Sequence, residues 1–383
     1  MPQVALLVET ALGSGREILK GISQFVHEKN NWEIFHYTGS LGAMMPDALS
    51  NWEGNGIIAR INSREELNVI RSKGVPVVDV LGNDPESEFP KVLCHNEAIT
   101  RMVLDHFTMR GFSNYAYFGV EGEFWAYERE EAFNRLGESM RGNFSVLDIS
   151  HAYRRNSSWK TYLAHVTDWL DSLEKPVGIY ICSDQFGPDI IAACAELDLK
   201  IPEDVALIGV DNDVAFCEVM RPSLSSVKPN HVQVGYTAAS LLQQMMEGGE
   251  EGIPPITRIA PYAIEERQST DVFALQEEGL KKALIAIRQR ACSGITVDEV
   301  AEYAGYSRSV LQRKFRSALG RTVYDFVINT RINRAKELLI MTNIQIAEIA
   351  VQAGFNHQEY LGLVFKKATG FTPAQYRKRF SRV

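Results

Sequence analysis

Residues 295–322 have the sequence ITVDEVAEYAGYSRSVLQRKFRSALGRT, and residues 344–372 repeat its pattern as IQIAEIAVQAGFNHQEYLGLVFKKATGFT. Each copy contains a short amphipathic segment, a glycine followed by an aromatic residue, a polar position and a second amphipathic segment. Helical periodicity on both sides of a glycine turn predicts a helix-turn-helix unit. We therefore expect two such units near the end of the chain.

The first copy supplies the residues that each part of the unit needs. Gly305 can take the left-handed conformation that ends a helix, and Ser307 can cap the next helix with its hydroxyl. The first helix should pack through Val297, Val300, Ala301 and Ala304. In the second helix we expect an inward set of Val310, Leu311 and Phe315 and an outward set of Arg308, Ser309, Gln312, Arg313, Lys314 and Arg316.

The second copy repeats this arrangement with other side chains. Gly354 is expected to form the turn and Asn356 to cap the following helix. The packing face of the first helix is formed by Ile346, Ile349, Ala350 and Ala353. In the second helix we expect an inward set of Tyr360, Leu361, Val364 and Phe365 and an exposed set of His357, Gln358 and Glu359.

Charge is divided unevenly along the chain. Residues 279–383 hold 18 Lys and Arg against 7 Asp and Glu, whereas residues 1–278 hold 22 against 41. A basic module attracts the DNA backbone, and polar side chains on a helix can distinguish bases in the major groove. The acidic remainder should repel DNA and so have another task. The alternative, a helical module that binds proteins, fits the charge, the duplication and the turn residues less well.

The duplicated region resembles the DNA-binding domain of AraC-type transcription regulators. The likeness covers roughly the last hundred residues and rests on A-x3-G-[FY], on G-[FR]-T-[PV] after the next helix, and on GFTPAQYRKRF at residues 370–380. It implies a long helix at about 322–341 joining two units that contact successive major grooves. By this likeness the base-reading positions fall on Ser309, Gln312 and Arg313 in the first unit and on His357, Gln358 and Glu359 in the second, with Arg308 as a further DNA contact. Leu363 stands where the family often carries Arg.

Composition bounds the rest of the chain. With 383 residues, of which 45% are hydrophobic, we expect two to three globular domains. No apolar run is long enough for a membrane span or a signal peptide. The five cysteines show neither C-x-x-C pairs nor zinc spacing, so we expect reduced, mostly buried thiols in a cytoplasmic protein, with no metal and no cofactor.

Before the duplicated region, short apolar runs alternate with helical patterns. The runs include VALLVE, WEIFHY, GIIARI, VPVVDVL, VLCH, YAYFG, FSVLDI, GIYIC and ALIGV. Strand-helix alternation at this cadence predicts parallel sheets with helices on both faces. The number of strands exceeds that of one ordinary open sheet, so we expect two subdomains.

Polar side chains follow several of these predicted strands. Glu9, Arg60 and Asn96 follow strands of the first subdomain, and Asp184 and Asp211 follow strands of the second. Ligands bind at the carboxyl ends of strands in such sheets. Carboxylates, amides and an Arg, with an aromatic such as Trp125 for stacking, suit a neutral polyol.

Other ligands and activities fit less well. A phosphate ligand would need a glycine-rich loop, which is absent. A carbohydrate hydrolase is the enzymatic alternative, but no pair of carboxylates and no nucleophile motif marks catalytic residues.

The segment from Val205 to Leu242 resembles the periplasmic-binding-protein-like sugar sensor of LacI-type repressors. The likeness rests on I-G-x-D, P-x-L-[ST]-[ST]-V and G-x-x-A-A-x-x-L, with GIYICSDQFGPDII and YEREEAF before them. It implies two Rossmann-like lobes crossed by three strands, a sugar clamped between them, and a dimer. By matched position Arg129, Asp184 and Asp211 are the best ligand contacts, and His95 stands where the family more often has Asp.

The order of the two parts, sensor before DNA-binding domain, is similar to that of enteric regulators of xylose catabolic genes. WAYEREEAF, GVDN, LSSV and EERQSTD carry this likeness. It implies D-xylose, or a related pentose or hexose, as ligand, activation as the sign of regulation, and RNA polymerase as a further partner. A DNA-binding repressor or architectural protein whose front domain only dimerises is the alternative.

We therefore predict an α/β two-lobed sensor followed by an all-α domain with two helix-turn-helix units. The sensor covers residues 1–266, a linker 267–278 and the DNA-binding domain 279–383. The first lobe is expected at about 1–108 plus 232–258, and the second at about 109–230 plus 259–266. Sugar binding is expected to close the lobes and to reposition paired DNA-binding domains.

Overall fold

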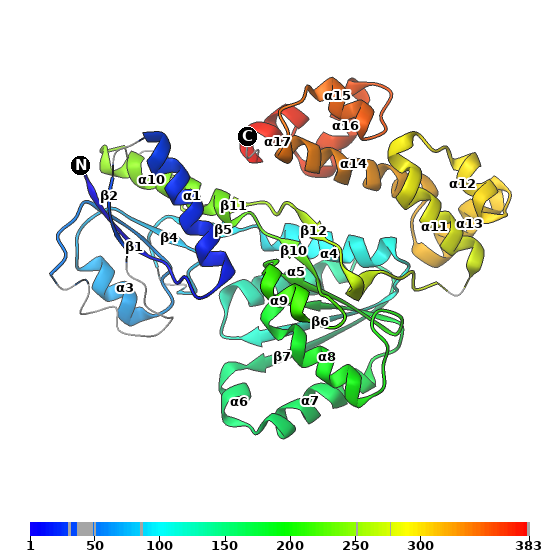
Figure 1. Ribbon diagram of the computed structural model, residues 1–383, viewed down its shortest axis with the longest axis horizontal. Helices are drawn as coiled ribbons and strands as arrows, with labels where there is room; N and C mark the ends of the chain where they lie inside the picture. The colour runs from blue at the N-terminus through cyan, green and yellow to red at the C-terminus, as the bar shows by residue number, and fades with distance from the viewer. Residues whose placement is uncertain are drawn as a thin grey trace.

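Two α/β lobes and one helical domain make up the structure of the chain, a computed structural model (Figure 1). It describes residues 1–29, 32–36, 49, 51–84, 87–249, 252–275 and 277–380. The predicted fold class, a two-lobed sensor followed by a helical domain, is confirmed. No described helix is both long and apolar enough to cross a membrane.

The first lobe is built on a parallel sheet of six strands in the order β11-β5-β4-β3-β1-β2. Val4 and Leu6 face α1 and α10, whereas Ala5 and Leu7 face α3, as the two-residue period of a strand requires. The elements are β1 (Gln3–Leu7), α1 (Gly13–Lys29), β2 (Glu33–His36), β3 (Gly56–Ala59), α3 (Arg64–Arg71), β4 (Val77–Val80), β5 (Lys91–Cys94), α10 (His231–Met246) and β11 (Ile256–Ile259). Most of the stretch between β2 and β3, where we expected a helix, lies outside the described residues.

The second lobe has a sheet in the order β12-β10-β9-β8-β6-β7, in which only β12 is antiparallel to its neighbour. Its elements are α4 (Asn96–Met109), β6 (Asn114–Glu121), α5 (Phe124–Gly137), β7 (Asn143–Ser150), α6 (His151–Asn156), α7 (Trp159–Ser172), β8 (Val177–Ile181), η1 (Asp184–Phe186), α8 (Gly187–Glu196), β9 (Val205–Val210), α9 (Val214–Val219), β10 (Ser225–Lys228), β12 (Ala263–Glu265) and η2 (Gln268–Thr270).

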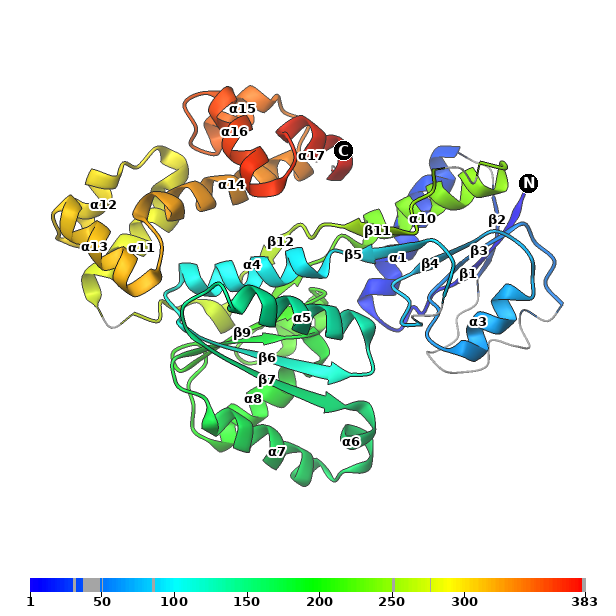
Figure 2. The same cartoon turned by 180° about the vertical axis from the view of Figure 1, so that it is seen from behind.

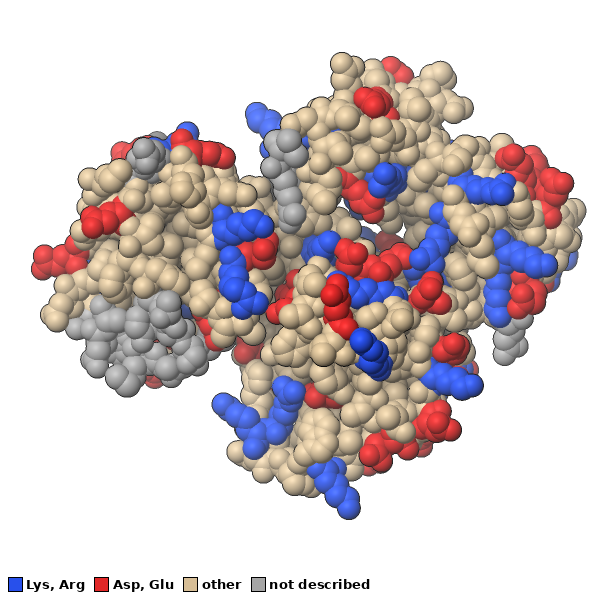
Figure 3. Space-filling view, viewed as in Figure 1, with Lys and Arg blue, Asp and Glu red and all other residues tan. Residues whose placement is uncertain are grey.

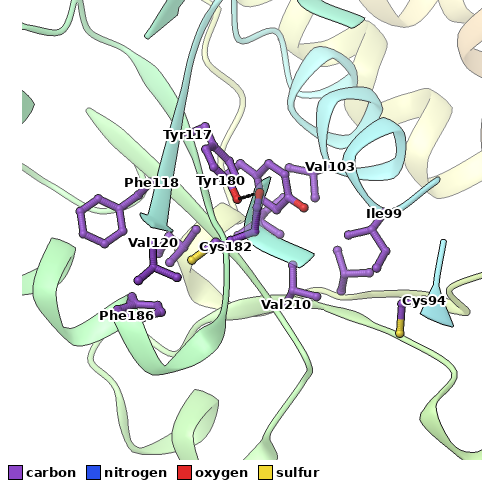
Figure 4. Close-up of a cluster of buried hydrophobic side chains, with 14 of the residues drawn as sticks. Cys94, Ile99, Val103, Tyr117, Phe118, Val120, Tyr180, Cys182, Phe186 and Val210 are labelled. Carbon is purple, nitrogen blue, oxygen red and sulfur yellow. Dashed lines mark hydrogen bonds between the residues drawn. The ribbon is translucent and has the colours of Figure 1, made fainter. Parts of the chain in front are cut away.

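The core of the second lobe lies on both faces of its sheet. Figure 4 shows Tyr117 and Tyr180 on the side of Val103 of α4, and Phe118 and Phe186 on the opposite side. Burial on both faces explains why these strands are continuous apolar runs in the sequence.

Three short connections join the lobes. The first follows β5, the second precedes α10, and the third is the stretch 260–262 between β11 and β12. Because α4 packs against α5, it belongs to the second lobe, so the first crossing lies near His95 rather than at residue 108 as we predicted. The helix that contains Arg129, α5, begins at Phe124.

The helical domain contains α11 (Glu278–Arg290), η3 (Ala291–Ser293), α12 (Val297–Ala304), α13 (Arg308–Leu319), α14 (Val323–Met341), α15 (Ile346–Gln352), α16 (Gln358–Thr369) and α17 (Pro373–Phe380). The first unit, α12 and α13, follows the prediction: Gly305 has φ of 71° and the Ser307 hydroxyl accepts from the Val310 amide. The long helix α14 also agrees with its predicted range of about 322–341.

Two details of the second unit, α15 and α16, differ from the prediction. The N-cap of α16 is His357 instead of Asn356, because the turn after Gly354 is one residue longer than the turn after Gly305. Tyr360, expected inside, is 41% exposed. Its hydroxyl instead contacts the hydroxyl of Tyr324, at the start of α14.

The expected linker at 267–278 is mostly part of the second lobe. The buried Ser269 hydroxyl donates to the Leu207 carbonyl over 2.7 Å and accepts from the Ser225 amide over 2.8 Å. Arg267 donates to Asn212 over 2.8 Å. The polar composition that suggested a linker satisfies backbone groups of this lobe, so the prediction of a free linker is wrong for residues 267–270.

Candidate functional site

A pocket lies between the lobes, at the carboxyl ends of strands from both sheets. It is lined by Leu12, Ser14, Arg60, Leu81, Gly82, Leu93, Cys94, Asn96, Phe124, Trp125, Glu128, Arg129, Ser183, Gln185, Asp211 and His231. This is the position at which ligands bind in open α/β sheets. Five of the seven predicted ligand residues line it: Arg60, Asn96, Trp125, Arg129 and Asp211.

Arg129, on α5, is held by contacts on three sides. Its side chain is 4% exposed. Nε donates to Asn96 Oδ1 over 2.9 Å, Nη1 donates to the Cys182 carbonyl, and the guanidinium lies 4.9 Å from the ring centroid of Trp125. Fixed in this way, the guanidinium has a defined orientation toward the pocket.

Asp211 occupies an unusual backbone conformation at the end of β9. Its φ is 106° and that of Asn212 is 48°, a region that side-chain-bearing residues rarely adopt. The Ser183 hydroxyl donates to Asp211 Oδ2 over 2.9 Å, and His231 Nε2 lies 3.4 Å from Oδ1. Burial alone would raise the pKa of Asp211, but His231 and Arg129 hold it below its usual value. The pocket therefore contains a carboxylate.

His231 supplies the opposite charge from the first turn of α10. Burial would lower the pKa of this imidazole, but Cys94 and Asp211 raise it to about 9. A charged His231 beside an ionised Asp211 forms an ion pair between the two lobes.

Asp184 is not among the pocket-lining residues, although we expected it to contact the ligand. It is 2% exposed, and its oxygens accept from the Ser226 hydroxyl, the Asp213 amide and the Cys217 thiol at 2.7, 2.9 and 3.3 Å. Burial and the nearby Asp211 raise the pKa of this carboxyl to about 8. Its position supports the turn that carries Asp211.

Glu9, which we predicted as a ligand contact, and His95, which stands at a family Asp position, also lie outside the pocket lining. Glu9 follows β1, and its Oε2 is buried without a hydrogen-bond partner in the described part of the chain. His95 caps α4 by accepting from the Ala98 amide over 3.3 Å, which is a structural use of its side chain.

Several lining residues were not predicted from the sequence, and Glu128 is the most connected of them. It accepts from Asn96 over 2.8 Å and forms a two-point contact with Arg258 of β11 at 2.6 and 3.1 Å. The signal was present, because Glu128 precedes Arg129 in the same helix. His231 could also have been predicted from the sequence, because it begins the helix that follows the second connection between the lobes.

Polar contacts bridge the lobes around the pocket. Asn83 of the first lobe donates to Glu123 of the second, and Arg16 lies 3.8 Å from Asp213. The Arg258–Glu128 pair adds a third bridge. These contacts hold the lobes against each other on the side of the pocket.

The predicted DNA-contacting residues lie on α13 and α16. Arg308, Ser309, Arg313, His357, Gln358 and Glu359 are exposed, and Gln312 is half-buried. Arg308 is paired with Asp298 over 2.9 Å. Leu363 is 66% exposed, so this apolar side chain lies on the surface of α16.

The two helix-turn-helix units are fixed relative to each other. A Cβ at Gly354 would lie 2.7 Å from the Ala291 carbonyl oxygen, so the turn of the second unit packs directly on the backbone of η3, which leads into the first unit. Arg331 of α14 donates to the same carbonyl over 2.8 Å. The spacing between α13 and α16 is therefore set by contacts as well as by α14.

A two-lobed sensor with a pocket at its strand ends, joined to two helix-turn-helix units, defines a ligand-responsive DNA-binding transcription regulator. Three known families match along the chain: the XylR N-terminal domain over residues 3–95, the periplasmic binding protein-like domain over 104–270 and a helix-turn-helix domain over 300–379. The chain is 30% identical to the xylose operon regulatory protein of Escherichia coli K12, over 100% of this chain and 98% of that protein. It belongs to the family of xylose operon regulatory proteins.

Further relatives agree with this assignment. The Haemophilus influenzae xylose operon regulatory protein is 28% identical over 98% of both chains. The solved structure of a xylose-binding transcription activator, XylR, superposes with a TM-score of 0.61, 27% identity and coverage of 100% of this chain and 99% of that one. A LacI-type regulator from Alkaliphilus metalliredigens in complex with D-xylulofuranose shares the sensor fold, with a TM-score of 0.54, 16% identity and coverage of 70% of this chain and 99% of that one.

The assignment decides between the alternatives raised by the sequence. The family consists of DNA-binding transcription regulators, so the carbohydrate-hydrolase alternative is wrong, as is a helical module that binds only proteins. The predicted periplasmic-binding-protein-like sensor and the predicted helix-turn-helix domain are both confirmed, each for its own part of the chain.

Proposed function

We propose that this protein is a D-xylose-responsive transcription activator that acts in the cytoplasm as a homodimer. The observation that carries the proposal is the pocket whose lining comes from both lobes, with Arg60 on one side and Arg129 and Asp211 on the other. A ligand that contacts both sides stabilises the arrangement in which the lobes meet, and it shifts the population toward that arrangement.

The chemistry of the pocket favours an uncharged sugar. The Asp211 carboxylate can accept hydrogen bonds from neighbouring hydroxyls. Arg60 Nε is buried and has no hydrogen-bond partner among the residues that the structure describes, so it can donate to a ligand oxygen. Trp125, Phe124 and Leu12 offer apolar surface to C–H groups. We propose Arg129, Asp211, Arg60, Asn96 and Trp125 as sugar contacts, with Glu128 as support.

D-xylose is favoured over other pentoses by the relatives. Those from Escherichia coli and Haemophilus influenzae are named for the xylose operon, and the related solved structure is described as a xylose-binding activator. The same description supports activation, for which RNA polymerase would be the partner.

On DNA, α13 and α16 would enter successive major grooves of each half-site. Arg308, Ser309, Gln312 and Arg313 would contact the first groove. His357, Gln358 and Glu359 would contact the second. The basic helical domain supplies attraction to phosphates, with 18 Lys and Arg against 7 Asp and Glu.

A thermal-shift series tests the ligand. We expect D-xylose to raise the melting temperature more than D-ribose, L-arabinose or D-glucose at equal concentration. A hundredfold excess over Kd corresponds to about 2.7 kcal/mol of stabilisation. A protein whose front domain only dimerises would show no shift with any of these sugars, and that result would contradict the proposal.

A transcription assay tests the sign of regulation. Duplexes selected by the full-length protein from a randomised pool are placed before a promoter, and transcripts are measured with RNA polymerase, with and without D-xylose. We expect more transcript when the sugar is present. A decrease would show that the protein is a repressor.

A further inference from the structure

The third crossing between the lobes packs into the second helix-turn-helix unit. Tyr262 is 8% exposed and belongs to the hydrophobic core that α14, α15, α16 and α17 form. Ala260 and Ala263 pack against the same core. Other members of this core are Ile332, Ala335, Leu339, Ile349, Phe365 and Tyr376. Figures 1 and 2 both show the connection from β11 to β12 passing below α14 and α17.

The crossing is short and is held at both ends. At its start, Ile259 pairs with Cys94, and its carbonyl accepts from the His95 amide over 2.8 Å in the first lobe. At its end, the Tyr262 amide donates to the Lys228 carbonyl over 2.9 Å in the second lobe. Only residues 260 and 261 lie between these anchors, so a rotation of one lobe against the other must change the backbone here.

The same strand is also close to the pocket. Cys94, the partner of Ile259, lines the pocket, and Arg258 binds the pocket residue Glu128. A ligand that draws the lobes together therefore acts on β11 within one or two residues of the crossing.

The first helix-turn-helix unit is attached elsewhere. Arg321, just before α14, pairs with Asp105 of α4 over 2.6 Å. Arg288 of α11 pairs with Glu266 over 2.6 Å, and Glu266 also contacts Arg110 over 2.8 Å. Figure 3 shows charged side chains of both signs gathered where the helical domain meets the second lobe. The first unit is thus attached to the second lobe, whereas the second unit rests on the crossing.

We propose that Tyr262 is a positioning residue that couples closure of the lobes to the placement of the second helix-turn-helix unit. The inference rests on the proposed function, because it requires a ligand that changes the arrangement of the lobes. Closure changes the backbone at residues 260 and 261, immediately before Tyr262, so the Tyr262 ring shifts and the helices that pack around it are displaced. The ion pairs beside the first unit act as a pivot on the second lobe, so the DNA-binding domain, whose two units are fixed relative to each other, tilts as one body.

The test uses full-length wild type, Tyr262→Ala, Tyr262→Phe and Ile349→Val. Ile349→Val removes one methylene group from the same core, on α15, and serves as a control for loosened packing. For each protein we measure the Kd for a labelled duplex that the wild type selects from a randomised pool, with and without saturating D-xylose. We also measure the Kd for D-xylose alone by calorimetry. Coupled sites commonly change each other's affinity by about 5- to 150-fold.

We expect the ratio of DNA affinities with and without D-xylose to fall to about one in Tyr262→Ala, while the affinity for D-xylose stays near the wild-type value. Tyr262→Phe and Ile349→Val should keep the wild-type ratio, even if their DNA affinities fall in both conditions. A wild-type ratio in Tyr262→Ala overturns the inference. An equal loss of DNA affinity with and without D-xylose in Tyr262→Ala would also overturn the inference, because it would show that Tyr262 only stabilises the DNA-binding domain. If the wild-type protein itself bound DNA equally well with and without D-xylose, the proposed function would be wrong.

Discussion

Arg129 and Asn96 hold each other in place at the pocket, with Nε of Arg129 donating to Oδ1 of Asn96 over 2.9 Å. Asn96 in turn donates to Glu128 over 2.8 Å. This chain fixes the Asn96 amide orientation, because its oxygen faces a donor and its nitrogen faces a carboxylate. It also joins the first turn of α4 to α5, so the two helices present their polar groups to the ligand together.

Replacing Arg129 by Lys should weaken D-xylose binding about 10- to 100-fold, the equivalent of about 1.5–3 kcal/mol. An ammonium cannot donate to Asn96 and to the Cys182 carbonyl in the geometry of a guanidinium. Calorimetry on the full-length protein measures the change. Arg135→Lys is the matched control, because Arg135 is exposed on the same helix and pairs with Glu97. Equal affinities for wild type and Arg129→Lys would exclude Arg129 from the site.

The variants Asp184→Asn and Asp211→Asn should show which of the two carboxyl groups supports the structure and which contacts the sugar. Asp184 accepts three hydrogen bonds inside the second lobe, so its replacement should lower the melting temperature more than it lowers sugar affinity. Asp211→Asn should lower sugar affinity about 10-fold or more, since a charged acceptor is lost from the pocket. Melting curves and calorimetry on both variants decide the question. The opposite ranking would restore Asp184 as a ligand contact.

The raised pKa of His231 predicts that the folded protein loses stability at alkaline pH. The pKa of His231 in the folded protein is about 9, above the ordinary value of 6.5. Its contribution is therefore complete below pH 6.5 and is lost as the pH rises through about 9. The contribution is on the order of 3 kcal/mol. Denaturant titrations between pH 6 and 10 should show a smaller decline in the free energy of unfolding for His231→Gln than for wild type.

The control for this experiment is His165→Gln, which removes an exposed histidine from the second lobe. The raised pKa of Asp184, about 8, also makes wild type less stable as the pH rises from about 4 to 8. Only the difference between wild type and His231→Gln therefore reports on His231. If that difference were independent of pH, the ion pair with Asp211 would not contribute to stability.

Gly354→Ala should destabilise the DNA-binding domain more than Gly370→Ala. Both glycines have positive φ, 84° and 79°, so both substitutions carry a backbone penalty of about 1–2 kcal/mol. At Gly370 a Cβ meets no described residue within 4 Å, whereas at Gly354 it would lie 2.7 Å from the Ala291 carbonyl oxygen. DNA affinity should fall further in Gly354→Ala because the spacing of α13 and α16 changes. Equal effects would show that the two units are not held by this contact.

Side chains on α13 should divide into base contacts and phosphate contacts. Gln312→Ala is expected to relax base preference at one position of the half-site, at a cost of about 1–3 kcal/mol, without changing the salt dependence of binding. Arg313 is proposed as a base contact as well, so Arg313→Ala should relax base preference at another position; a salt slope reduced by about one instead would assign Arg313 to phosphate. Binding measured at several salt concentrations, on the selected duplex and its single-base variants, distinguishes the two. Arg334→Ala, an exposed residue of α14 paired with Glu337, is the control.

Much of the fold was predictable because its signals are local. Gly305 and Ser307 mark the turn of the first unit through backbone conformation and capping, which depend on a few neighbouring residues. The same reasoning misplaced the cap of α16, since the turn after Gly354 contains one extra residue that Asn356 does not reveal. Residues 267–270 were taken for a linker because their partners, such as Leu207 and Ser225, are far away in the sequence.

The sequence predicted that the pocket lies at the ends of strands, but not which of the residues there line it. The rule that ligands bind at the carboxyl ends of strands identified Arg60, Asn96 and Asp211, which line the pocket, but it gave equal weight to Asp184. What distinguishes Asp184 is that Ser226, Asp213 and Cys217 all direct donors at it, and these contacts span 29 to 42 positions of sequence. Glu128 was missed because the strand-end rule does not cover residues inside a helix, and its signal in the sequence is its place beside Arg129 in α5.

The anchoring of residues 267–270 in the second lobe constrains how chimeric biosensors can be built from this chain. A graft that joins a foreign sensor at residue 267 would keep Ser269 but remove Leu207 and Ser225, the two hydrogen-bond partners of its hydroxyl. The donor sensor would also have to bring its own substitute for Glu266, the anchor of α11. Fusion points should therefore lie immediately before α11.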